Sequence, residues 1–181
     1  MPEAYFDLSP KDRYDALEVA ASRSGKPAHL LEKDIWVVWT LRALFEAPFA
    51  QDIVFKGGTS LSKGYQAIER FSEDVDVTYD IRAIAPDLTS AESDGLPSTR
   101  SQEQRWTKII RERLTVWVRD TVSPMLIARL KDEKIAAVVT PGVDSVQIEY
   151  EQQVEGSGYV LPSCCSSSAP AQRENRSNDG P

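Results

Sequence analysis

The stretch FKGGTSLSKGYQAIERFSEDVDVTYD, residues 55–80, decides the fold prediction. A short apolar run stops at two glycines, Gly57 and Gly58, and residues 59–69 then have the apolar spacing of a helix. In DVDVTY, residues 74–79, apolar side chains alternate with acids, which is typical of a half-buried strand. The stretch therefore predicts a strand, a glycine turn, a helix and a second strand.

The rest of the chain supplies further helices and strands by the same criteria. Apolar spacing and terminal signals predict helices over 9–22, 29–46 and 102–132, the last broken or kinked at Pro124. Two runs of β-forming residues on either side of Pro141-Gly142 predict a hairpin with strands over 135–140 and 145–151. Residues 158–161 are a further candidate for a short strand. Residues 82–100 are predicted to be a loop. The sequence predicts an α/β (α+β) fold, with a small mixed sheet flanked by helices.

Composition bounds the functional classes. The chain has 181 residues, 41% of them hydrophobic, which suits one domain with a real core. No run approaches the roughly 20 apolar residues of a membrane span, no signal peptide is visible, and we expect a cytoplasmic protein. The net charge is −7, so any contact with nucleic acid must be local or made at one end of the substrate.

Two other motif interpretations of residues 55–80 fail. A phosphate loop of the G-x-x-x-x-G-K-[ST] type does not fit from either Gly57 or Gly58. A calcium loop fits loosely at Asp74, Asp76 and Thr78, but Tyr79 stands where that loop needs glycine. A purely structural interpretation, in which a glycine turn precedes a solvated strand face, stays open beside the functional one.

The functional interpretation is nucleotidyl transfer. Glycines let the backbone approach phosphate oxygens, a following helix offers free N–H groups, and Thr59 and Ser60 add hydroxyls. Asp74 and Asp76, at i and i+2 on a strand, point the same way and can share hard cations such as Mg²⁺. Paired metal ions can activate an attacking oxygen and stabilise a leaving pyrophosphate.

The segments GGTSL, residues 57–61, and RFSEDVDV, residues 70–77, together resemble the AbiEii/AbiGii-type nucleotidyltransferases, toxins of the DNA polymerase β-like superfamily. LLEKDIWVVWTL, residues 30–41, is similar to the helix before the motif in many members. The resemblance implies a sheet of nucleotidyltransferase type and transfer of a nucleoside monophosphate from a nucleoside triphosphate, with Mg²⁺ or Mn²⁺. The acceptor it implies is RNA, for some relatives the end of a tRNA, or protein, and a cognate antitoxin is an expected partner.

The resemblance assigns site residues by position. Asp74 and Asp76 become the catalytic, metal-binding pair. The triphosphate-binding residues it implies are Gly57, Gly58, Thr59 and Ser60, with Lys56 and Lys63 as further candidates. Arg70 and Ser72 are candidate phosphate or acceptor contacts. For these two residues and for both lysines, an ordinary surface position is an open alternative.

Other polar and aromatic residues receive structural or secondary roles. His29 is expected at a helix start, and the four tryptophans are expected in the core before any base-stacking role. The superfamily usually has a third carboxylate on the same sheet, and Glu149 and Glu151 are the candidates here. The tryptophans are Trp36, Trp39, Trp106 and Trp117.

The composition changes abruptly at Ser163. Residues 1–162 are predicted to be an incomplete nucleotidyltransferase-like domain, and 163–181, without a large apolar residue, a disordered tail. The tail can be back-translated into a DNA sequence with permitted codons. Read in the frame that begins one base earlier, that DNA encodes VLLEFGARSTGEPVERRA, and the codon of its first glutamate overlaps the codons of Ser166 and Ser167. We therefore expect a frameshifted or truncated member, which the gene's DNA sequence read in all frames would test. An inactive nucleotide-binding remnant and a partner-binding module are the alternative functions.

Overall fold

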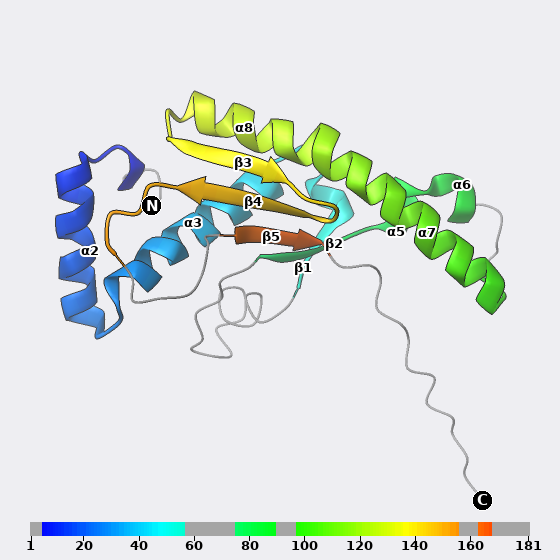
Figure 1. The fold of residues 1–181 in the computed structure, drawn as a ribbon, viewed down its shortest axis with the longest axis horizontal. Coiled ribbons are helices and arrows are strands. Elements are labelled where there is room, and N and C mark those ends of the chain that lie inside the picture. The colour runs from blue at the N-terminus through cyan, green and yellow to red at the C-terminus, as the bar shows by residue number, and fades with distance from the viewer. Residues whose placement is uncertain (1–4, 57–74, 90–96, 156–162, 168–181) are drawn as a thin grey trace, which may run out of the picture.

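The computed structural model describes residues 5–56, 75–89, 97–155 and 163–167 (Figure 1). Runs of helices and runs of strands follow one another along the chain, which confirms the predicted α+β fold class. The helices are α2 Pro10–Ser24, α3 Ala28–Phe45, α5 Ile81–Ile84, α6 Pro86–Thr89, α7 Arg100–Trp117 and α8 Ser123–Asp132, with a 3₁₀ turn η1 at Ala50–Asp52 and a π-helical turn η3 at Val118–Val122. The strands are β1 Ile53–Lys56, β2 Asp76–Tyr79, β3 Ala137–Pro141, β4 Ser145–Tyr150 and β5 Ser163–Ser167.

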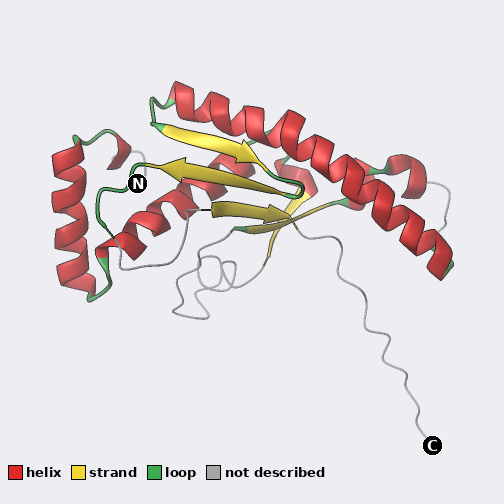
Figure 2. Cartoon of the chain, in the orientation of Figure 1, coloured by secondary structure: helices red, strands yellow, loops and turns green. Residues whose placement is uncertain are grey.

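The strands form one mixed sheet in the order β1-β2-β5-β4-β3. β2 and β5 are parallel, and the other neighbouring pairs are antiparallel. In Figure 2, α3 crosses behind the strands. The small mixed sheet flanked by helices is therefore the predicted architecture.

One face of this sheet builds the core. Its buried side chains, such as Val77 on β2 and Ile148 on β4, pack in one cluster with α3, η3 and α8. Trp39 and Leu126 are fully buried there. The alternate positions of β2 and β4, such as Asp76 and Gln147, are polar and half-buried or exposed, and we call this side the open face.

The first two helices follow their terminal signals. The Ser9 side chain accepts a hydrogen bond from the backbone N–H of Asp12, and Pro10 occupies the first turn of α2. Gly25 ends the helix in the left-handed conformation, with φ 69°. The predicted tryptophan positions are also confirmed, because three are buried and Trp117 packs against the core.

The long helix predicted over 102–132 is divided. α7 and α8 are joined by η3, directly before Pro124. Proline has no N–H and its ring clashes with the carbonyl four residues earlier, so a regular α-helix cannot run through this point. The hydroxyl of Ser123 donates to the carbonyl oxygen of Val118 at 2.9 Å within this turn.

Two predictions about irregular segments are wrong. Residues 81–89, in and beside the predicted loop, form the short helices α5 and α6, and the Asp80 side chain caps α5 by accepting from the N–H of Arg82. Ser163–Ser167, predicted to begin a disordered tail, form β5 in the middle of the sheet. Strands pair through backbone N–H and C=O groups, and every residue except proline carries both. The side-chain composition of residues 163–167 therefore did not reveal the strand.

Several predictions lie outside the described residues. These are the helix over 59–69, the strand at 158–161 and the tail from residue 168. They stay predictions, as does the frameshift.

Candidate functional site

Four residues, one on each of four neighbouring strands, lie opposite one another across the sheet. Lys56 on β1 pairs with Asp76 on β2, Asp76 pairs with Ser166 on β5, and Ser166 pairs with Ser145 on β4. We call these four residues the cross-strand row. Strands in a sheet lie about 4.8 Å apart, so Asp76 and Ser145 are about 10 Å apart at Cα.

The alternation of β2 turns Asp76 to the open face. Val75 is fully buried and Val77 is 5% exposed, so both side chains enter the core. Asp76 lies between them and must therefore project to the opposite side. Lys56, its antiparallel partner, projects to the same side. A carboxylate and an ammonium group thus stand side by side on the polar face.

The C-terminal end of β2 is held by neighbouring elements. The Asp80 N–H donates to the Asp52 carbonyl oxygen at 2.7 Å, and the Tyr79 ring lies 4.3 Å from the Trp117 ring, centre to centre. Burial, followed by the nearby Asp52 and Asp80 carboxylates, raises the pKa of the Tyr79 hydroxyl. These contacts fix the register that places Asp76.

The two candidate third carboxylates do not join Asp76. Glu149 lies on the open face of β4, four residues beyond Ser145. At about 3.3 Å per residue along the strand, its Cα is about 16 Å from that of Asp76, too far to share one metal ion. Glu151 lies beyond the end of β4. The prediction that either completes the carboxylate set with Asp76 is therefore wrong.

Most of the predicted site lies outside the described residues. Of the predicted residues the structure describes Lys56 and Asp76 and brings them together. The remainder stay predictions: Gly57, Gly58, Thr59, Ser60, Lys63, Arg70, Ser72 and Asp74.

Comparison with family models identifies the chain's relatives. The model for the nucleotidyl transferase AbiEii toxin of type IV toxin–antitoxin systems matches residues 39–163. The chain belongs to this family. The match includes every residue that the sequence assigned to the site, and it ends at Ser163, the first residue of β5.

The other comparisons add no relative of this AbiEii-family chain. No curated protein and no solved structure matches it. None of the helices in the described ranges is long and apolar enough to span a bilayer.

The described residues could supply only part of a site for the Mg²⁺ ion expected from the sequence. Among the described residues, no group of three histidine, cysteine or acidic side chains could hold a metal ion. Asp76 supplies one oxygen ligand of the type that Mg²⁺ prefers. The fit therefore depends on Asp74, two residues earlier in the sequence.

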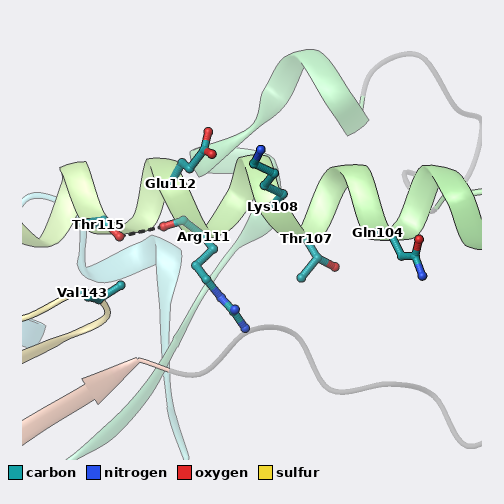
Figure 3. Close-up of a pocket in the computed structure, with 7 residues that line it drawn as sticks. All are labelled: Gln104, Thr107, Lys108, Arg111, Glu112, Thr115 and Val143. Carbon is teal, nitrogen blue, oxygen red and sulfur yellow. Dashed lines mark hydrogen bonds between the residues drawn. The ribbon is translucent and has the colours of Figure 1, made fainter.

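Two features of this family member were missed at the sequence level. A polar groove runs along α7, lined by Gln104, Thr107, Lys108, Arg111, Glu112, Thr115 and Val143 (Figure 3). The Glu32 carboxylate on α3 is only 2% exposed and accepts the backbone N–H of Gln153. The excess of basic residues in 100–113 could have indicated a polar, cationic surface on this helix. Nothing in the sequence indicated that Glu32 would be buried.

Proposed function

We propose that this chain is a metal-dependent nucleotidyltransferase that moves a nucleoside monophosphate from a nucleoside triphosphate to RNA. One observation carries the proposal: Asp76 projects from the open sheet face beside Lys56, within the segment that matches the AbiEii family. A type IV toxin–antitoxin family also implies a cognate antitoxin, and we expect the protein to act in the cytoplasm.

Each group has a definite role in this proposal. Asp74 and Asp76 would hold Mg²⁺ or Mn²⁺, which neutralises phosphate charge and activates the attacking oxygen. Lys56, beside Asp76 in register, contributes positive charge toward the triphosphate. The glycines and hydroxyls of residues 57–60 bind its phosphate oxygens.

A second candidate function has its own support. The position that faces Asp76 on β5 is Ser166, so the neighbouring strand supplies no carboxylate at this level. A chain that holds a nucleotide through residues 57–60 but lacks a complete carboxylate set would bind without transferring. This inactive nucleotide-binding remnant is the alternative.

Transfer of an α-³²P-labelled nucleotide to RNA tests the proposal. The wild-type chain with Mg²⁺ should label total tRNA, and chelation by EDTA should stop it. Asp76→Asn should lower the rate by at least about a hundredfold, because a metal ligand is lost. Glu149→Gln is the matched control on the same face and should leave the rate within about threefold of the wild-type value.

The outcomes separate the two functions. Equal losses in Asp76→Asn and Glu149→Gln would contradict the assignment of Asp76. Nucleotide binding by the wild-type chain with no transfer to RNA would support the remnant instead.

A further inference from the structure

A groove of about 460 Å³ lies along α7, beside the turn between β3 and β4. Gln104, Lys108 and Arg111 line it at intervals of four and three residues, so they follow one stripe along the helix. All three side chains are exposed. At 1.5 Å per residue the stripe extends about 10 Å along the helix axis.

The charge of α7 differs from that of the whole chain. Its sequence, RSQEQRWTKIIRERLTVW, contains five cationic and two acidic side chains, whereas the chain has a net charge of −7. Arg113 is engaged by Asp87 across the helix pair. Lys108 and Arg111 form no ion pair with any of the described residues. They therefore place positive charge along α7 in an acidic protein.

The hydrogen-bonding capacity of the groove lies in a few side chains. The hydroxyls of Thr107 and Thr115 each donate to a carbonyl oxygen of their own helix at 2.9 Å, as drawn for Thr115 in Figure 3. Binding an anion therefore depends on Gln104, Lys108 and Arg111. Glu112 also lines the groove; in Figure 3 it projects from the side of α7 opposite to Arg111, and the Lys108 ammonium lies toward the Glu112 side.

The groove adjoins the candidate site through the β3–β4 hairpin. Val143, in the turn between these strands, lines the groove. It precedes Ser145 by two residues, and Ser145 belongs to the cross-strand row that contains Asp76. A ligand that lies in the groove can therefore reach toward the row over a distance of about 10–20 Å.

We propose that the α7 groove binds the phosphate backbone of the RNA acceptor through Lys108 and Arg111. This rests on the proposed nucleotidyl transfer to RNA. Lysine and arginine side chains are among the groups that contact phosphates and so position a nucleic-acid backbone. Val143 is the one apolar residue among those that line the groove. A protein partner would normally need an apolar or aromatic centre, so the lining favours RNA.

Fluorescence anisotropy with a labelled single-stranded RNA of about 20 nucleotides tests the groove in the full chain. Lys108→Gln and Arg111→Gln should each weaken binding, on the order of three- to tenfold at low salt, and each should reduce the slope of log affinity against log salt by about 0.7. Glu112→Gln should strengthen binding, because a like charge beside the phosphates is removed. Lys131→Gln on α8, the same change at an exposed site outside the groove, should have no effect.

Three results would overturn the inference. They are an unchanged affinity in the Lys108→Gln/Arg111→Gln double variant, an equal loss in Lys131→Gln, and competition by poly-glutamate as strong as by unlabelled RNA. Asp76→Asn separates this inference from the proposed function, since it should lose transfer and keep RNA affinity. A wild-type chain that binds RNA through Lys108 and Arg111 but transfers nothing would refute only the transferase.

Discussion

At the residue scale, Glu133 connects α3 to the end of α8. Its carboxylate accepts the indole N–H of Trp39 and a guanidinium N–H of Arg42, each at 2.7 Å, and it also pairs with Arg129. Burial alone would raise the pKa of Glu133, but the Trp39 and Arg129 hydrogen bonds and the charge of Arg42 hold it below its ordinary value. The ionised form is therefore part of the packing.

Glu133→Gln should destabilise the fold by about 1–3 kcal/mol at neutral pH, since charge-assisted bonds to two arginines are lost. A lowered pKa means that this stability exists above the ordinary pKa of 4.5 and disappears as the pH falls through the lowered pKa. Urea unfolding followed by tryptophan fluorescence at neutral and acidic pH measures the difference. Glu46→Gln removes only the more exposed partner of Arg129 and should cost no more than about 1 kcal/mol. Equal costs for the two variants would contradict this role.

Glu32 has the opposite pH dependence. Burial raises its pKa, while the N–H groups of Gln153 and Val154 and the charge of Arg13 act against that rise. Stability from this group is full below the ordinary pKa of 4.5 and is lost as the pH rises through the raised value.

Glu32→Gln keeps a carbonyl oxygen that can accept the Gln153 N–H and removes the buried charge. The variant should gain stability relative to the wild-type chain as the pH rises above 4.5. Urea midpoints measured between pH 4 and pH 8 check this. A stability difference that does not change with pH would count against it.

At the element scale, the join between α7 and α8 depends on Ser123, which is 2% exposed. Ser123→Ala removes the buried hydrogen bond to the Val118 carbonyl and should cost about 1 kcal/mol of unfolding free energy. Thr107→Ala removes the same kind of hydroxyl-to-carbonyl bond at an exposed position and should cost less than about 0.5 kcal/mol. Chemical denaturation compares them, and an equal cost would show that the π-helical turn does not need the serine.

Elements with local signals were predictable, and those that depend on distant pairing were not. Ser9, Gly25 and Pro124 each mark a helix boundary through backbone chemistry, and the β3–β4 hairpin has alternating strands around Pro141-Gly142. β5 has no such pattern, because its place between β2 and β4 comes from backbone pairing with strands far away in the sequence. The one-turn helices α5 and α6 are too short for apolar periodicity to reveal.

At the scale of the whole molecule, the sheet order decides which parts of the site prediction agree with the structure. Alternation along one strand was enough to place Asp76 on the polar face, and the structure adds Lys56 as its neighbour. The same alternation could not exclude Glu149 as a third metal ligand. Its distance from Asp76 depends on β5, which lies between β2 and β4 in the sheet. The net negative charge of the chain restricted any nucleic-acid contact to a local one or to one end of the substrate, and α7 carries five cationic side chains.

Thiophilic metal rescue tests the central claim most directly. Asp76→Cys should lose nucleotidyl transfer to RNA in Mg²⁺ and regain part of it in Cd²⁺, because a thiolate binds the softer ion. The wild-type chain in Cd²⁺ controls for binding at Cys164 and Cys165. Restored transfer in Cd²⁺ would place residue 76 on the metal ion. Undiminished transfer by Asp76→Cys in Mg²⁺, or loss that no metal ion restores, would contradict the account.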